Sequence, residues 1–90
     1  MNNYKGFTGL EGYKNSRELR KSIATLAGKF PKEERYELVS QIKRSSRSIT
    51  ANIAEGYGRY TYLDTRHFFI IARGSVTDTM EHLMTALDEN

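Results

Sequence analysis

Three basic side chains near the middle of the sequence have the types and the spacing needed to contact phosphate groups. Lys43, Arg44 and Arg47 fall within about 100° of one another on a helix of 3.6 residues per turn. Ser40 and Ser48 extend the same stripe with hydroxyl groups. Such cations hold a nucleic acid by its phosphates without reading its sequence. The alternative is an ordinary solvated helix face, because the chain has no helix-turn-helix, zinc-finger or RNA-recognition signature.

A cation and two aromatic rings follow in a short segment of the chain. Arg59, Tyr60 and Tyr62 lie close together, directly after the sequence NIAEGYG. Aromatic rings beside an arginine can stack on unpaired bases. Tyrosines at the end of a helical bundle also serve for packing, with their hydroxyl groups in water. Both interpretations of this segment stay open from the sequence.

The two glycines of NIAEGYGRY do not have the context of a phosphate-binding loop. Such a loop needs a strand before its tight turn and a helix after it, whereas a helical pattern precedes Gly56. Gly56 falls on the apolar side of that helix, so its missing side chain would let another helix approach closely. We expect Gly58 to adopt a left-handed conformation and to end the helix, with Arg59 near the negative end of the helix dipole.

Side chains for catalysis are sparse. His67 and His82 lie about four turns apart on one predicted helix, so they cannot share a metal ion. Asp78 and His82 are four residues apart, but no third ligand accompanies them. No serine stands at a recognisable spacing from a histidine base, and cysteine is absent. We therefore expect no enzymatic activity, no metal and no other cofactor.

The composition describes one small globular domain over residues 1–90. Of its 90 residues, 38% are hydrophobic and 28% are charged, with a single proline. A chain this short buries only about 60–65% of its unfolded surface, which favours self-assembly. No signal peptide or membrane-spanning stretch is evident, so we expect a cytoplasmic protein with no membrane contact. The net charge of +3 fits a nucleic acid or an acidic partner, and fits plain solubility equally well.

The first two predicted helices follow from apolar residues at spacings of three and four. Residues 1–9 lack this pattern and are expected to form a flexible arm, in which Thr8 and Glu11 have the spacing of a capping box. The first helix is expected over residues 10–28 and the second over residues 31–57, beginning at the only proline. Their expected core faces are Leu19, Ile23, Leu26 and Phe30, and then Leu38, Val39, Ile42, Ser46, Ile49, Ile53 and Tyr57.

The third predicted helix spans residues 63–88 and carries two apolar stripes. Thr61 and Asp64 have the spacing of a helix cap at its start. Its main stripe consists of Phe68, Ala72, Ser75, Thr79, Leu83 and Ala86. An adjoining stripe consists of Phe69, Ile70, Val76, Met80, Met84 and Leu87. Together they exceed the width that one partner helix covers, so a further helix or another subunit is expected there.

Arg73 and Gly74 interrupt the apolar pattern of the third helix. A glycine inside a helix costs about 1 kcal/mol relative to alanine, which indicates a close contact with another helix. Arg73 projects between the two stripes, so we expect it to pair with a carboxylate at a helix or subunit contact, with Glu55 as the candidate. The residues expected at such contacts are Gly56, Gly58, Phe69, Arg73, Gly74, Met80, Met84 and Leu87.

A resemblance to a known family rests on two segments: FPKEERYELVSQIKRSSRSITANIAEGYGR at residues 30–59 and FFIIARGSVTD at residues 68–78. They closely resemble the bacterial four-helix-bundle family first described from intervening sequences in 23S ribosomal RNA genes, often labelled S23 ribosomal protein. The accessory variability determinant of diversity-generating retroelements belongs to the same group. The blocks NIAEG and IARGS are the most specific part of the match. Tyr13 stands where the family usually has tryptophan, and Thr50 where it typically has proline.

The resemblance implies an antiparallel up-and-down bundle that commonly assembles as a homopentamer and has no known catalysis. It also implies a fourth helix, expected beyond Asn90, and a kink in the second helix that Thr50 would soften or remove. Nucleic-acid binding and association with a reverse transcriptase are described for the retroelement members.

The sequence therefore favours a non-enzymatic, oligomeric all-α bundle that presents a basic surface to RNA, DNA or a nucleic-acid enzyme such as a reverse transcriptase. The residues expected to contact nucleic acid are Lys43, Arg44, Arg47, Arg59, Tyr60 and Tyr62. The alternative is a protein–protein interaction scaffold with no nucleic-acid role. Salt-dependent binding to RNA separates the two.

Overall fold

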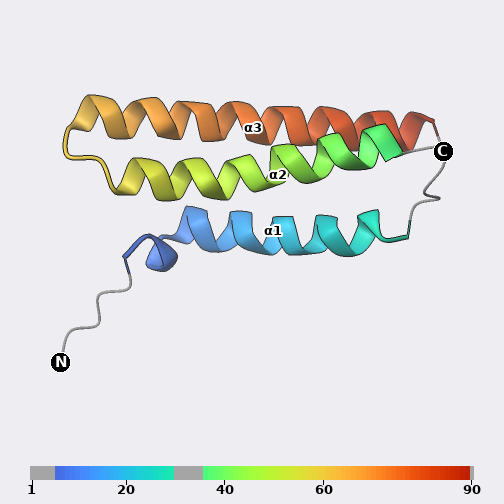
Figure 1. Ribbon diagram of the computed structural model, residues 1–90, viewed down its shortest axis with the longest axis horizontal. Coiled ribbons are helices and arrows are strands. Elements are labelled where there is room, and N and C mark those ends of the chain that lie inside the picture. Colours follow the sequence, from blue (N-terminus) through green and yellow to red (C-terminus); the bar gives the residue numbers. More distant parts are fainter. Residues whose placement is uncertain (1–5, 30–35, 90) are drawn as a thin grey trace.

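The chain folds into antiparallel α-helices that run up and down. The computed structural model describes residues 6–29 and 36–89, and all statements below refer to these residues. They contain three α-helices and no strand, which confirms the predicted all-α class (Figure 1). The elements are the 3₁₀ turn η1 (Gly6–Gly9) and the helices α1 (Glu11–Ala27), α2 (Tyr36–Tyr57) and α3 (Tyr62–Asp88).

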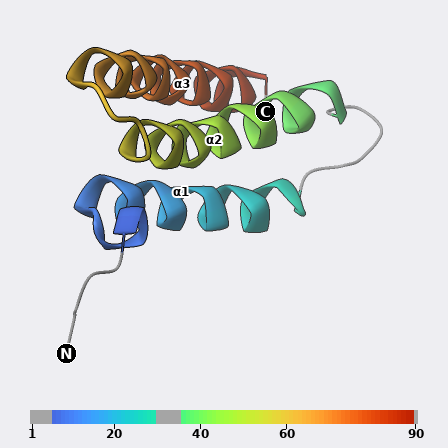
Figure 2. The same cartoon turned by 60° about the vertical axis from the view of Figure 1, so that its left-hand side comes forward.

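The helix α2 lies between the other two, as both views of the ribbon show (Figures 1 and 2). It packs against α1 on one flank and against α3 on the other. Among the described residues, no Cα atom of α1 lies within 8 Å of a Cα atom of α3. The three helices therefore form an open layer, in which α1 and α3 are both partly uncovered.

The core lies along α2 and follows the predicted helical stripes. Ile42 and Ile49 are 2% and 1% exposed, and Ile42 joins Ile23 of α1 and Ala86 of α3 in one apolar cluster. The main stripe of α3 is buried as predicted at Ala72, Ser75, Thr79 and Ala86. Leu19 and Leu26 of α1 remain 36% and 42% exposed, because α1 has a neighbour on one flank only. Phe30 lies outside the described residues.

A polar seam joins α2 to α3. The Ser75 hydroxyl donates a hydrogen bond to Oγ of Ser48, and the Thr79 hydroxyl donates to Oγ of Ser45, both at 2.8 Å. Thr79 is also 2.7 Å from the backbone oxygen of Ser75. These short side chains let the two helices pack closely while their hydroxyls are satisfied, which removes the cost of burying them.

The two helix starts that the structure describes differ in their capping. Thr61 caps α3 as predicted, because its Oγ1 accepts a hydrogen bond from the backbone N–H of Asp64 at 3.1 Å. At α1 the N-cap residue is Leu10, which forms no side-chain cap, and Thr8 belongs to the turn η1. Part of the expected flexible arm is thus a folded turn. Residues 1–5 and the expected start of the second helix at Pro31 lie outside the described residues.

Gly58 follows the end of α2 without adopting the expected left-handed conformation. Among the described residues, only Gly6 has a positive φ, at 61°. The N–H of Gly58 instead donates to the backbone oxygens of Ala54 and Glu55, at 3.3 and 3.2 Å. The next N–H, of Arg59, donates to the oxygen of Gly56. The helix therefore tightens into a final 3₁₀-like turn, which satisfies its last carbonyls without a left-handed residue.

Gly56 is a point of close approach between α2 and α3. A Cβ atom placed on Gly56 would lie 2.8 and 2.9 Å from ring carbons of Phe69 and 3.1 Å from Cβ of Phe68. Gly56 is buried, and no larger residue fits without displacing these side chains. This is the close helix contact that the sequence indicates for Gly56.

Gly74 and Arg73 behave differently from what the sequence predicts within one chain. A Cβ atom placed on Gly74 would meet no other atom within 4 Å, so no described helix approaches it. Arg73 is exposed, and its expected partner Glu55 forms an ion pair with Arg59 instead, at 2.7 Å. The close helix contact expected at Gly74 and the pairing of Arg73 with Glu55 are therefore both absent among the described residues. Their role at a subunit contact stays a prediction.

We predict opposite effects of alanine at the two glycines. Gly56→Ala should lower the free energy of unfolding by about 1–2 kcal/mol, because it overpacks a filled contact. Gly74→Ala should raise it by up to about 1 kcal/mol, because alanine favours the helix and meets no neighbour. Urea unfolding followed by circular dichroism at low protein concentration measures both. Equal stability of the two variants would contradict the packing described for Gly56.

Candidate nucleic-acid interface

The basic stripe of α2 is solvent-accessible and not neutralised by carboxylates. Arg44 and Arg47 are exposed and Lys43 is half-buried. Arg44 donates a hydrogen bond through Nη2 to Oγ of Ser40, one helical turn away, at 3.1 Å. None of the three cations forms an ion pair with another described residue. Their charges are therefore available to an anionic partner.

Arg20 of α1, which is not among the residues predicted from the sequence, extends this stripe. The half-buried Arg20 donates through Nη1 to Oγ1 of Thr50 at 2.9 Å. Thr50 is 2% exposed, and its hydroxyl also lies 3.1 Å from the backbone oxygen of Arg47. Residues 43, 47 and 50 share one flank of α2 by their spacing. Arg20 therefore lies beside the cations of α2, and the basic surface spans two helices.

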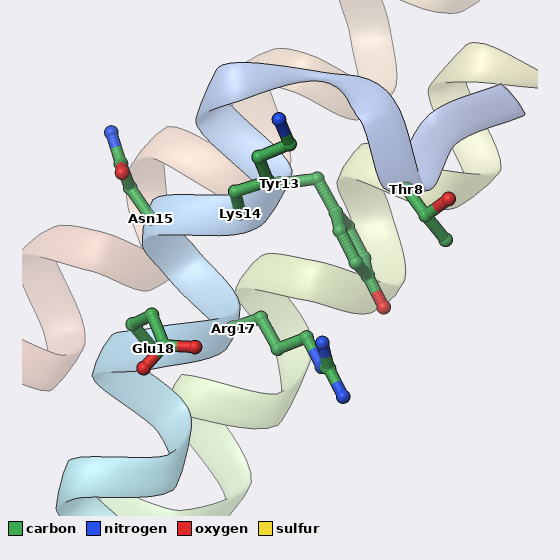
Figure 3. A pocket seen from close by; sticks show the side chains of 6 residues that line it. All are labelled: Thr8, Tyr13, Lys14, Asn15, Arg17 and Glu18. Carbon is green, nitrogen blue, oxygen red and sulfur yellow. The ribbon is translucent and has the colours of Figure 1, made fainter. Parts of the chain in front are cut away.

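The start of α1 adds further polar groups beside this surface. A hollow of about 610 Å³ lies here, lined by Thr8, Tyr13, Lys14, Asn15, Arg17 and Glu18. Figure 3 shows the Tyr13 phenol and the Arg17 guanidinium directed to the same side of α1, with Asn15 on the opposite side. The Tyr13 ring packs edge-on against Phe7 at 5.0 Å between centroids. Arg17 is three residues from Arg20, so both cations follow one face of α1.

We call Arg17, Arg20, Lys43, Arg44 and Arg47 together the basic surface. No member of this set has an ion-pair partner among the described residues. A signal for the two α1 members was present in the sequence, since arginines three apart lie on one helix face. What the sequence could not supply was the bond between Arg20 and Thr50, which are 30 residues apart.

The three residues predicted to contact nucleic acid in the loop after α2 have different surroundings. Tyr60 is fully exposed and Tyr62 is 78% exposed, so neither ring packs in the bundle. Arg59 is engaged within the chain: its Nη2 pairs with Glu55 at 2.7 Å, and its guanidinium carbon lies 4.6 Å from the centroid of the Phe68 ring. The rings are available for stacking on bases, whereas the Arg59 charge is already partly compensated.

The loop tyrosines and the basic stripe of α2 lie on one molecule but are not adjacent. Ten residues of helix separate Arg47 from Tyr57, or about 15 Å at 1.5 Å per residue. A flexible polynucleotide of a few nucleotides covers such a distance. One strand could therefore contact the basic surface with its phosphates and the loop with its bases.

A polar cleft of about 380 Å³ lies between α2 and α3. Its lining residues are Gln41, Arg44, Ser45, Ser48, Ser75, Asp78 and His82. Asp78 and His82, the pair weighed as metal ligands from the sequence, both belong to it. No group of three or more histidine, cysteine or acidic residues is suited to a metal ion within the described ranges. The structure therefore offers two ligands here and no described third one.

An apolar groove runs between α1 and α3, with α2 as its floor. It encloses about 470 Å³ and is lined mainly by apolar groups, among them Ile49 and Ile53 of α2 with Phe69 and Val76 of α3. Arg73 lies at its edge. The groove results directly from the missing contact between α1 and α3. In a bundle of four up-and-down helices, the first and third lie diagonally, and the fourth occupies this position.

None of the described helices is both long enough and apolar enough to cross a membrane. This agrees with the exposed cations on α1 and α2.

A sequence model of the family described as 23S rRNA-intervening sequence protein matches residues 8–90 of the chain. The match covers all three helices and the loop between α2 and α3. The chain belongs to this family. A search of curated proteins found no match to the sequence. Membership in the intervening-sequence family confirms the resemblance carried by NIAEG and IARGS, and it covers helix α1, which resembles the family less closely than the rest.

Gly56 gives the NIAEG block a structural role in this member of the intervening-sequence family. The glycine sits against Phe68 and Phe69, which begin the second resembling segment. Arg59 caps the same contact from outside through the Phe68 ring. The two segments that carry the family resemblance thus meet in space, at the end of the bundle that carries the loop tyrosines.

We predict that Arg59 acts on stability and Arg47 does not. Arg59→Ala should lower the free energy of unfolding by about 1 kcal/mol, since it removes a partly exposed ion pair and a contact with an aromatic ring. Arg47→Ala, the same substitution at an exposed position of α2, should alter it by less than about 0.5 kcal/mol. Thermal and urea unfolding measure both. Equal effects would show that the Arg59 contacts do not persist in solution.

Proposed function

We propose that this member of the intervening-sequence family is a non-enzymatic, cytoplasmic helical-bundle protein that binds RNA or DNA through the basic surface of α1 and α2. The observation that carries the proposal is the set of five cations on two adjacent helices without a carboxylate partner among the described residues. A protein monomer has no structural need for such a set. Phosphate groups neutralise it, and release of their counterions drives binding.

Single-stranded nucleic acid fits the surroundings of the basic surface better than a duplex. Tyr60 and Tyr62 are exposed at the end of α2, where unpaired bases can stack on them. A base within a duplex has no free face for such stacking. Binding is expected to be independent of sequence, because phosphate contacts and stacking do not distinguish among bases.

We further propose that the protein is a homo-oligomer, a pentamer by the resemblance to its family. Support comes from the apolar groove between α1 and α3 and from two exposed apolar side chains of α3, Phe69 and Leu87, which are 41% and 69% exposed. A fourth helix after Asn90 or a neighbouring subunit would cover the groove. Repetition of the basic surface around an assembly would strengthen binding through several weak contacts at once. A reverse transcriptase is the expected protein partner in a retroelement setting.

A second candidate function is that of a protein–protein interaction scaffold. The apolar groove favours it, because a groove of this kind accepts an amphipathic helix of another protein. In that case the basic surface would serve solubility or contact an acidic partner, and nucleic acid would play no part.

We predict that charge reversal at the basic surface abolishes most binding to nucleic acid. The variant with Lys43→Glu, Arg44→Glu and Arg47→Glu should bind mixed-sequence single-stranded RNA at least tenfold more weakly at about 50 mM salt. Its dependence of log K on log salt should also fall by about two units or more, since each phosphate contact contributes about 0.7 for single strands. Fluorescence anisotropy of a labelled RNA of about 20 nucleotides measures both quantities.

The matched control is Lys29→Glu, which reverses a cation outside the basic surface, at the end of α1. It should change the affinity by less than about threefold, because only the long-range field of the protein changes. If wild-type protein does not bind the RNA at low salt, nucleic-acid binding is ruled out and the scaffold function remains.

A further inference from the structure

One face of α3 is left without a partner among the residues that the structure describes. The helix forms an edge of the layer, and its buried stripe packs on α2 (Figures 1 and 2). The opposite side of α3 is exposed along its whole length. We call this side the outer face of α3; it consists of Arg66, Ile70, Arg73, Gly74, Thr77, Met80, Glu81, Met84 and Asp88.

The charges of the outer face are arranged with opposite signs about its centre. The two cations, Arg66 and Arg73, lie before Thr77, and the two anions, Glu81 and Asp88, lie after it. None of these four side chains forms an ion pair with any described residue. Thr77 is four residues from both Arg73 and Glu81, and eleven residues from both Arg66 and Asp88.

This arrangement is self-complementary in an antiparallel pair. If two copies of α3 cross antiparallel with a two-fold axis at Thr77, Arg73 of each copy faces Glu81 of the other. In the same register, Arg66 of each copy faces Asp88 of the other. A parallel pairing would instead bring like charges together along the whole helix. Opposite charges at matched positions set orientation and register between helices.

The apolar residues of the outer face match in the same register. Ile70 of each copy comes opposite Met84 of the other, since the two are equally distant from Thr77. Met80 comes opposite Gly74, at which a side chain would meet nothing within 4 Å in the single chain. The vacant space at Gly74 accommodates the long methionine side chain. Ile70, Met80 and Met84 are 40%, 61% and 54% exposed in the single chain, so their burial would drive the association.

From this complementarity we infer that the outer face of α3 binds the outer face of α3 in a second copy of the chain, antiparallel and about a two-fold axis at Thr77. The contact goes beyond the proposed function and does not depend on nucleic-acid binding. It also differs from the contact within a pentameric ring, because a ring requires two different surfaces, whereas a two-fold contact uses one surface twice. Two chains, or two rings, can pair through it.

The first test uses a cross-link at the two-fold axis. The chain contains no cysteine, so Thr77→Cys introduces a single thiol, close to its counterpart only if the axis passes there. Mild oxidation should convert most of this variant to a disulfide-linked dimer. The matched control is Ser22→Cys, at an exposed position of α1, which should stay largely unlinked. Equal cross-linking of both variants, or none at Thr77→Cys, would overturn the inference.

The second test exchanges the charges that set the register. Arg73→Glu and Glu81→Arg, each alone, should weaken two-fold pairing at least tenfold, because like charges then face each other twice. The double variant should regain the wild-type constant within about threefold. Analytical ultracentrifugation measures the pairing, and circular dichroism checks that each variant is folded.

The outcomes of the charge exchange are decisive in both directions. If the single variants paired weakly because they were misfolded, the double variant, which carries both substitutions, would pair weakly too. Recovery of pairing in the double variant would therefore support the inferred contact. Single variants that pair as well as the wild type, a double variant without recovery, or a wild type that is monomeric at micromolar concentration would each overturn it. The single variants should still bind RNA at low salt, because their basic surface is unaltered, which keeps this result separate from the proposed function.

Discussion

The structure depends on one constraint: α2 packs against both other helices, whereas no Cα atom of α1 lies within 8 Å of a Cα atom of α3. The two contacts of α2 differ in chemistry. Against α3 it uses short side chains, with Ser45 and Ser48 bonded to Thr79 and Ser75, and with Gly56 under the Phe69 ring. Against α1 it uses an apolar contact around Ile23 and the polar bond from Arg20 to Thr50. Because α2 uses both flanks in this way, one of its remaining sides becomes the floor of an apolar groove and the other carries the basic stripe. The layer is therefore two-sided, and its two sides suit different partners.

Because the layer is two-sided, the proposed oligomer contacts and the proposed nucleic-acid contacts need not compete for the same surface. Apolar area is left on the groove side and on the outer face of α3, where its burial stabilises an assembly. The cations lie on the other side of α2, where assembly through the groove or α3 would leave them exposed. Like charges brought together in an assembly repel one another, and an anionic ligand relieves that repulsion. Oligomer formation and phosphate binding are thus expected to support each other in this family member.

Features that depend on helical periodicity could be predicted from the sequence. Features that depend on which side chains from other parts of the chain lie nearby could not. The stripes of α2 and α3 and the Thr61 cap could be predicted, because each rests on spacings of three or four residues. The end of α2 was predicted at the right place but with the wrong geometry, since a 3₁₀-like turn satisfies the same carbonyls as a left-handed glycine. Gly74 shows a related limit. The free-energy cost of glycine within a helix indicates that the residue has a structural reason, but it does not identify which helix would approach it. Spacing along a helix does not decide which of several possible partners a long side chain binds. The hydrogen bond from Arg20 to Thr50 and the ion pair of Arg59 with Glu55 could therefore not be predicted.

Thr50 links the architecture to the candidate site. At the position where the family typically has proline, α2 continues unbroken from Tyr36 to Tyr57, and the Thr50 hydroxyl lies against the backbone oxygen of Arg47. The same hydroxyl accepts the bond from Arg20, which a proline could not do. Arg20 is therefore already held at the junction of two helices, whereas Arg47 is exposed. Fixing a long side chain on binding costs about 0.5–1.5 kcal/mol, so a cation that is held beforehand contributes more of its attraction to affinity. With threonine at this position, α2 continues without a break and the Arg20 side chain is held by a hydrogen bond. The basic surface of this chain therefore includes cations from two helices.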